Sequence, residues 1–458
     1  MPFLDDHYLL GGDTARELYR QIAQLPIVDP HNHADVREIC EDRNYPDIWQ
    51  VEAATDHYVW EMLRKRGVAE ELITGAASNR DKWLALAAVF DDLVGSPTYE
   101  WIHLDLRRRL GLDTLIGADT GAALWDATRN ILQRPDMRPR ALLRAMRVED
   151  LCSTDDPCDR LECHRRLADD RFPTRVHPTF RPDKAMNIFK PDWRDYIARL
   201  ETRVGATFTS VGDLVAALRL THDYFAENGC VASDHGVQTP YGFDIETADA
   251  DAAFRKAREG RRLEPAETVA FMSYILNEVA ELDAAKGWVF QLHLGCVRDV
   301  RDRLARTVGP DSGGDISDHA IDIVTPLVPF LNRFDGRLKV VLYTLDPSHQ
   351  PTVATLCRAF GADVNLGSAW WFNDTPIGMR RQLEYIGSVD LLSNFAGMVS
   401  DSRKLLSYGS RHEMFRRVLC DVVGTMVARG QMPSHLAERL VRRLAYDRPR
   451  QLFGFAPA

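Results

Sequence analysis

The sequence lacks the cysteine spacing of a disulfide-rich or zinc-ribbon protein. Its cysteines are spread along the chain, and no C-x-x-C pair occurs. Both classes of protein place their cysteines in close, paired spacing, so neither is indicated here. Scattered thiols are typical of a reducing compartment, and we therefore expect a cytoplasmic protein. The cysteines are Cys40, Cys152, Cys158, Cys163, Cys230, Cys296, Cys357 and Cys420.

Long apolar runs and an excess of basic residues are also missing. No stretch approaches the roughly 20 uncharged apolar residues that a membrane-spanning helix needs. The first residues, Met-Pro-Phe-Leu-Asp-Asp, carry acid where a secretory signal would be basic and then apolar. The net charge of -10 argues against a nucleic-acid-binding surface. We expect neither a membrane nor a nucleic acid as partner, and the sequence leaves a homo-oligomer open.

Short β-rich runs alternate with helical segments along most of the chain. Alternation of this kind predicts a parallel sheet, and eight strand–helix units predict an α/β fold of the (β/α)8 TIM-barrel type. The runs lie at residues 25–30, 148–152, 174–180, 230–235, 288–293, 338–343, 363–367 and 395–401.

The long interval after the first predicted strand is rich in helix formers and poor in β-branched runs. We predict that it forms a helical cap inserted into the barrel, with a shorter helical insertion at residues 182–229. The predicted organisation is one catalytic unit in three parts. These are an N-terminal helix with the first strand at 1–33, the cap at 34–146, and the rest of the barrel at 147–458.

Two histidines follow the first predicted strand with one residue between them. Side chains two residues apart on a strand point the same way, so His31 and His33 can bind one ion. Barrel active sites form where the strands end, and Asp401 ends the eighth predicted strand. We predict one divalent metal ion held by His31, His33 and Asp401, with His293 nearby. Zinc is the first expectation, and the ligand set equally suits manganese or iron.

Other strand ends also carry polar side chains. Arg181 and Arg403 are candidates for binding a substrate carboxylate, because the guanidinium fork pairs with both carboxylate oxygens. A structural ion pair with Asp183 or Asp155 is the alternative for Arg181. Asp234 and His293 end the fourth and fifth predicted strands, and Trp370 either packs the cap or walls the pocket.

The sequence resembles the uronate isomerases, also called glucuronate isomerases, a branch of the amidohydrolase superfamily. The resemblance covers nearly the whole chain, and the Trp-Trp-Phe-Asn-Asp and Asp-Ser-Arg segments are its specific part. The motifs are Asp29-Pro30-His31-Asn32-His33, Asp56-His57-Tyr58, Tyr99 to Leu106, Thr154 to Pro157, Thr179 to Lys184, Ser233 to Gly236, Gln291 to His293, Trp370 to Asp374, Ser400 to Arg403, Ser407-Tyr408, and Arg411-His412-Glu413.

The resemblance implies an enzyme that interconverts D-glucuronate with D-fructuronate, and D-galacturonate with D-tagaturonate, in sugar-acid breakdown. It implies metal binding by His31, His33 and Asp401. Catalytic roles are expected for Asp401, Tyr58, Arg403 and His293, and substrate binding for His57, Arg181, Asp234 and Trp370.

The expected reaction is an aldose–ketose isomerisation through an enediol. Asp401 would take a hydroxyl proton to open the sugar ring. The group that carries the C2 proton is left open between Tyr58 with Arg403, and His293. The alternative is a metal-dependent hydrolase that uses an activated water against an amide or lactone, and a non-catalytic sugar-acid-binding protein is a third class.

Two loops depart from the family pattern. Gly314 stands where an aromatic residue is usual, and Asp346 stands where asparagine is usual. We expect these departures to affect the choice of substrate rather than the type of reaction.

Overall fold

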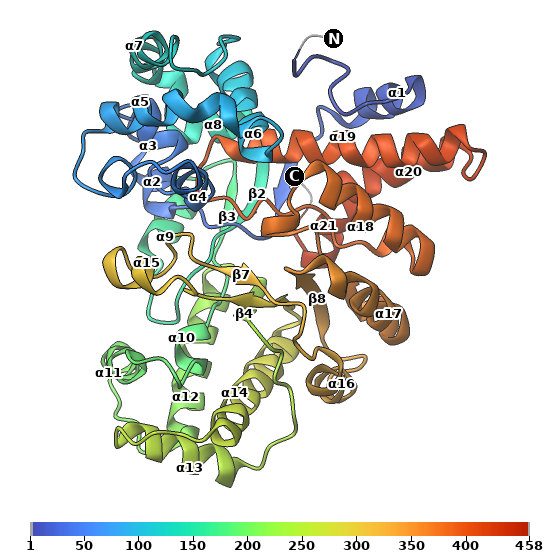
Figure 1. Ribbon diagram of the computed structural model, residues 1–458. Helices are drawn as coiled ribbons and strands as arrows, with labels where there is room; N and C mark the ends of the chain where they lie inside the picture. The colour runs from blue at the N-terminus through green and yellow to red at the C-terminus, as the bar shows by residue number, and fades with distance from the viewer. Residues whose placement is uncertain (1–2, 457–458) are drawn as a thin grey trace.

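The structure is a computed structural model that describes residues 3–456, with helices arranged around parallel strands (Figure 1). One parallel sheet has the order β1-β2-β3, and a second has the order β4-β5-β8-β9. The expected α/β fold with parallel sheets is thus confirmed. The strands are β1 Ile27–Asp29, β2 Val148–Cys152, β3 Arg175–His177, β4 Ala232–Val237, β5 Val289–Leu294, β6 Cys296–Val297, β7 Ile316–Ser317, β8 Lys339–Thr344 and β9 Val364–Leu366.

The two parallel sheets are linked through Phe180, which forms single bridges to Asp155 on one side and to Ser233 on the other. Phe180 N donates to Ala232 O at 3.2 Å, and Asp234 N donates to Phe180 O at 3.0 Å. The strand ends of both sheets therefore lie side by side.

Residues 34–146 form seven α-helices and, within the part of the chain that is described, no strand. Figure 1 shows these helices gathered at one end of the molecule. They pack on a hydrophobic cluster built mainly from their own side chains, among them Trp49, Trp83 and Phe90. The helices are α2 Val36–Glu41, α3 Ile48–Glu52, α4 His57–Lys65, α5 Asn79–Val89, α6 Pro97–Asp105, α7 Gly121–Leu132 and α8 Pro139–Ala145. Between them lie the 3-10 helices η1 Glu70–Leu72, η2 Phe90–Leu93 and η4 Pro135–Met137 and the π-helix η3 Leu106–Leu110.

The remaining helices surround the strands, and α1 packs along α19. None of the described helices is long and apolar enough to cross a membrane. The helices are α1 Asp13–Ile22, α9 Glu162–Asp169, α10 Asp183–Met186, α11 Trp193–Val204, α12 Val211–Glu227, α13 Thr247–Arg258, α14 Pro265–Lys286, α15 Asp302–Thr307, α16 Val324–Arg333, α17 Gln350–Phe360, α18 Pro376–Val389, α19 Ser407–Ala428, α20 Ser434–Arg442 and α21 Arg448–Phe453. The 3-10 helices are η5 Pro347–His349, η6 Gly361–Asp363, η7 Trp371–Asn373 and η8 Leu392–Asn394, and η9 Arg443–Asp447 is a π-helix.

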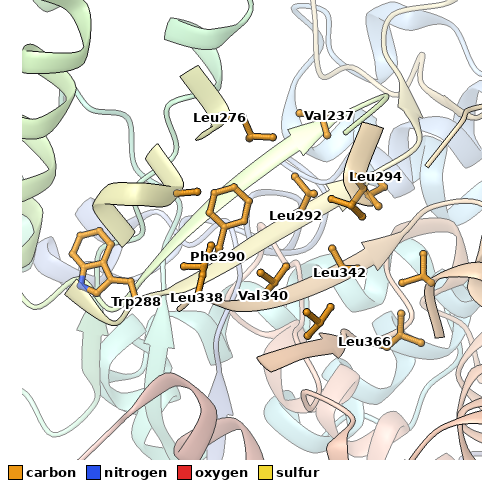
Figure 2. Packing of buried hydrophobic residues seen from close by; sticks show 14 of the residues in the cluster. Val237, Leu276, Trp288, Phe290, Leu292, Leu294, Leu338, Val340, Leu342 and Leu366 are labelled. Atoms are coloured by element: carbon orange, nitrogen blue, oxygen red, sulfur yellow. The ribbon is translucent and has the colours of Figure 1, made fainter. Parts of the chain in front are cut away.

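Successive side chains of β5 point to opposite faces of the sheet, so the strand contributes to two different environments. Phe290, Leu292 and Leu294 belong to the large core beneath the helices, where Figure 2 shows them beside residues of α14 and β8. Alternate residues point to the other face, where Gln291 accepts from the Tyr343 hydroxyl at 2.9 Å and His293 stacks on the Tyr343 ring. One strand thus supplies both core packing and polar groups for a site.

Three predictions about strands need correction. The predicted strand 395–401 does not form, because Gly397 has a φ of 106° and Ser400 N donates to the Asp29 side chain instead of to a neighbouring strand. The predicted strand 174–180 shrinks to β3 and two isolated bridges at Phe180. The antiparallel pair β6–β7 was not predicted, since each strand has only two residues.

Candidate active site

Three predicted ligands meet beyond the end of β1. The Nε2 atom of His31 lies 3.3 Å from Asp401 Oδ1, and Nε2 of His33 lies 3.1 Å from the same oxygen. Asp401 adopts a φ of 50°, and its amide donates to the His31 carbonyl at 3.2 Å. That backbone bond brings together two residues, His31 and Asp401, that are 370 positions apart in the sequence. The three side chains form a group that could hold a metal ion.

A second group of potential ligands shares His31. Asp234 lies with Oδ1 at 2.7 Å from His293 Nδ1 and with Oδ2 at 3.7 Å from His31 Nδ1. Among the described residues, His31 Nδ1, Asp234 Oδ1 and both ring nitrogens of His293 are buried without a correctly oriented hydrogen bond. Buried polar atoms normally have partners. Unpartnered imidazole and carboxylate atoms fit the ligand preferences of a divalent transition metal.

Neighbouring charges set the protonation of these groups. Burial alone would raise the pKa of Asp401, but His31 and His33 outweigh it and hold that pKa well below its ordinary value. Burial is also outweighed at Asp234, where Arg181 and the histidines lower the pKa. At His33 burial dominates and lowers the pKa to about 4. The site therefore holds ionised carboxylates beside a neutral imidazole, the forms in which both bind metals.

Arg181 is engaged by two aspartates. Its Nε donates to Asp183 at 2.8 Å, and its Nη1 donates to Asp234 at 2.8 Å. A side chain at Gly236 would place Cβ 2.3 Å from Arg181 Nη2, so the glycine makes room for the guanidinium. The structural pairing with Asp183 is therefore present, and Asp155 is not the partner.

His57 and Tyr58 begin α4, whose start is capped by Asp56. The Asp56 side chain accepts from Tyr58 N at 2.9 Å, which fixes the first turn of the helix. The rings of His57 and Tyr58 stack at 4.8 Å, and the Tyr58 hydroxyl is buried without a partner among the described residues. Burial raises the pKa of Tyr58 well above its ordinary value. Tyr58 therefore keeps its proton at neutral pH.

One cavity of about 490 Å³ collects most of the predicted site residues. Asp234 and Tyr58 lie behind its wall, in contact with His293 and His57 respectively. Trp370 forms part of the wall, and its Nε1 donates to Asp401 Oδ2 at 3.0 Å. The predicted residues that line the cavity are His31, His33, His57, Arg181, His293, Trp370, Asp401 and Arg403.

Several polar residues of this site were not predicted from the sequence. Arg298 and Asp311 line the cavity and come from the segment between β6 and β7. Arg411 lies behind Tyr58, with its guanidinium 5.1 Å from that ring and with Nη1 donating to Asp374 at 3.0 Å. The Arg411 motif was recognised without a role, whereas no sequence pattern singled out Arg298 or Asp311.

Comparison with known proteins identifies the family. The family model described as glucuronate isomerase matches residues 1–453. The uronate isomerase of Thermotoga neapolitana is 49% identical, over 98% of this chain and 99% of the relative.

Solved structures agree with this match. A crystal structure of uronate isomerase from Thermotoga maritima superposes with a TM-score of 0.97 at 49% identity, covering 98% of this chain and 99% of that one. The glucuronate isomerase of Caulobacter crescentus gives a TM-score of 0.94 at 27% identity, with 99% and 98% covered. The resemblance expected from the sequence motifs is confirmed. The chain belongs to the glucuronate isomerase family and is an enzyme of the uronate isomerase class.

Proposed function

We propose that this enzyme interconverts D-glucuronate with D-fructuronate, and D-galacturonate with D-tagaturonate, in the cytoplasm. The observation that carries the proposal is the meeting of His31, His33 and Asp401 with Arg403 at one cavity. Family membership favours this reaction over the hydrolase alternative, which would use the same ligand types.

The architecture we propose is a (β/α)8 barrel with residues 34–146 as a helical cap. Support comes from one hydrophobic cluster that joins residues of β1, β2, β4, β5 and β8, including Val28, Ala232 and Val341. Backbone bonds from Ala396 N to Leu366 O and from Asp401 N to His31 O place residues 396–401 between β9 and β1. In this arrangement the segment takes the eighth strand's position without forming a regular ladder.

We assign His31, His33 and Asp401 to one divalent metal ion, with zinc expected first. Such an ion supplies positive charge that polarises bound oxygen atoms. The convergence of both Nε2 atoms on Asp401 Oδ1, at 3.3 Å for His31 and 3.1 Å for His33, supports the assignment. The second group, which contains Asp234, already pairs with Arg181 at 2.8 Å. That cation makes Asp234 a poorer choice of ligand than Asp401.

Asp401 acts first in the mechanism we propose. Its lowered pKa keeps the carboxylate ionised at neutral pH, so it can accept a hydroxyl proton and open the hemiacetal ring. Trp370 orients this carboxylate through its indole N–H. The Asp401 side chain is 12% exposed and lines the cavity, so a substrate in the cavity can contact it.

Proton transfer from C2 to C1 follows ring opening. We assign it either to Tyr58 acting with Arg403, or to His293. His293 lines the cavity and Tyr58 lies behind His57. We assign Arg403, which lines the cavity, to stabilising the enediolate oxygen. One such preorganised donor lowers the activation free energy by roughly 3 kcal/mol.

The test is proton NMR of the enzyme with D-glucuronate in D2O, before and after chelation of metal. We expect a ketose to appear with deuterium at the exchanging carbon. Chelation should slow the reaction at least about tenfold, because metal charge stabilises the transition state. Ketose without deuterium would favour a hydride shift or a shielded proton. No conversion of D-glucuronate or D-galacturonate by the metal-loaded enzyme would refute the proposed substrates.

A further inference from the structure

A second cavity lies at the start of β1, away from His31 and His33 beyond the end of that strand. It has a volume of about 310 Å³ and is lined by residues of 23–27, which lead into β1, and of 145–147, which lead into β2. Further walls come from η3 and α19, at the end of the molecule where Figure 1 shows α1, α8 and α19. Among the described residues, none lines both this basal cavity and the active-site cavity.

The lining of the basal cavity is strongly basic. It contains five arginines against two carboxylates, an excess of three positive charges, whereas the whole chain has a net charge of -10. Positive charge is therefore concentrated at one place in an acidic protein, which favours binding of an anion there. The arginines are Arg108, Arg109, Arg147, Arg416 and Arg417, and the carboxylates belong to Asp6 and Glu413.

Two of the arginines use the buried carboxylate of the cavity. Glu413 accepts from Arg108 at 3.0 and 2.9 Å and from Arg417 at 3.0 Å. Within residues 3–456, the guanidinium groups of the other three arginines have no carboxylate oxygen within 4.0 Å. Three cations at one cavity are thus left without a counter-ion from the protein.

Arg416 is buried with neutral partners. It is 4% exposed, and its Nη atoms donate to the carbonyls of Ala23, Leu25 and Pro26 at 3.3, 2.8 and 2.7 Å. Its Nε is buried without a hydrogen-bond partner in the described part of the chain. Burial lowers the pKa of Arg416 to about 10. An uncompensated buried charge is unfavourable, and an anion in the cavity would offset it.

Arg109 and His412 supply donors that an anion needs. The guanidinium of Arg109 approaches α19 at Gly409, where an added Cβ would lie 3.3 Å from Nη2. His412 is 2% exposed, and its Nε2 is buried with no partner among the described residues. Burial lowers the pKa of His412 well below its ordinary value, so the imidazole is neutral and can donate one hydrogen bond. Buried polar atoms normally have partners, and a ligand would provide one here.

We propose that the basal cavity binds a phosphate group, either as inorganic phosphate or as part of a small phosphate ester. A phosphate ester carries about -1.5 to -2 charges at neutral pH and three acceptor oxygens, so it fits the excess of positive charge better than one carboxylate does. Arginine suits this ligand because its planar fork of donors matches phosphate geometry. The bound group would join η3, the segment before β2 and α19, and so stabilise the fold.

Three variants test the site. Arg109→Met removes a cation that has no counter-ion, and Arg147→Met removes an exposed one, so the second variant remains informative if the first does not fold. Arg144→Met is the matched control, because Arg144 is exposed on α8 and does not line the cavity. Melting curves followed by circular dichroism confirm that each variant is folded.

Calorimetric titration with inorganic phosphate measures the affinity, at an ionic strength held constant with sodium chloride. We expect saturable binding by the unmodified enzyme and an affinity at least about tenfold lower for Arg109→Met, since charge-assisted bonds are lost. Affinity should fall severalfold for Arg147→Met and stay unchanged for Arg144→Met. The result does not depend on the proposed isomerisation, because binding is measured directly.

Titrations with glycerol 3-phosphate and with malonate identify the ligand class. Tighter binding of glycerol 3-phosphate than of inorganic phosphate would assign the site to a phosphate ester, and the reverse order would assign it to inorganic phosphate. Malonate is a dicarboxylate of similar charge, and malonate binding as tight as that of phosphate would overturn the assignment. Absence of phosphate binding at millimolar concentration would also overturn it, as would equal affinities of the unmodified enzyme, Arg109→Met and Arg147→Met.

Discussion

At the scale of single residues, burial and two hydrogen bonds fix the protonation state of His103. His103 in α6 is 4% exposed, and both of its ring nitrogens are used. Nδ1 lies 2.9 Å from the Tyr99 carbonyl oxygen, and Nε2 accepts from Ile116 N at 3.0 Å. These partners require a neutral imidazole with the proton on Nδ1. Burial lowers the pKa of His103 to about 4, although the Tyr99 carbonyl opposes the shift.

This lowered pKa predicts loss of stability in acid. The unfolded histidine binds a proton near pH 6.5, so the free energy of unfolding should fall by up to roughly 3 kcal/mol as pH drops from 6.5 towards 4. His103→Gln should lack this part of the pH dependence. Urea unfolding at several pH values measures how the free energy of unfolding changes with pH in the unmodified protein and in His103→Gln. The same change in both proteins would show that His103 is not the titrating group.

At the scale of elements, a buried lysine ties the Asp401 loop to helices of residues 34–146. Lys404 Nζ donates to Glu52 of α3 at 3.0 Å and lies 3.4 Å from Asp56, the cap of α4. Lys404 is 3% exposed and Glu52 is fully buried. Burial raises the pKa of Glu52 despite the lysine. The start of α4, with His57, is therefore supported by the loop that carries Asp401 and Arg403.

Removing this cation should destabilise both elements. Lys404→Met removes the donor to the buried Glu52 carboxyl and the cation beside the buried Asp56 carboxylate, a loss that typically costs about 3 kcal/mol of unfolding free energy. Turnover should fall as well, because His57 loses support for its position. The double variant Lys404→Met with Glu52→Gln should recover part of the stability. Chemical denaturation and steady-state kinetics test this, and a double variant no more stable than Lys404→Met would contradict it.

At the scale of the whole molecule, Glu413 of α19 connects three distant segments. Arg108 from η3 donates to both of its oxygens at 3.0 and 2.9 Å, and Arg417 donates at 3.0 Å. Arg417 also donates to the carbonyls of Asp6 and Tyr8 near the N-terminus. Burial alone would raise the pKa of Glu413, but the two arginines outweigh it and lower that pKa.

Substitution of Glu413 should therefore lower the free energy of unfolding by an amount that depends on pH. Because the pKa of Glu413 is lower in the folded protein than its ordinary value near 4.5, ionised Glu413 stabilises the fold at pH values above 4.5. This stabilisation is lost as the pH falls from 4.5 through the pKa of the folded state. Glu413→Gln should therefore destabilise the protein by about 3 kcal/mol at pH 7. The difference from the unmodified protein should shrink below pH 4.5. Unfolding of both proteins at pH 7 and pH 4 measures it, and a constant difference would argue against an ionised Glu413.

Local patterns determined much of this molecule. The two-residue spacing of His31 and His33 placed both side chains at one strand end, because alternation along a strand is a local property. Helical periodicity defined residues 34–146 as all-helical for the same reason. The motifs around Trp370 and Arg403 were enough to predict the family.

Tertiary structure alone decided which groups became partners. Arg181 pairs with Asp234 across 53 residues, and Asp311 meets Arg403 across a longer interval. No local period encodes such contacts, since they depend on how distant segments pack. The segment 395–400 has the composition of a strand, yet it bonds to the Asp29 side chain and forms none. The sequence thus determined which chemical groups stand at the strand ends, and packing determined what each group binds.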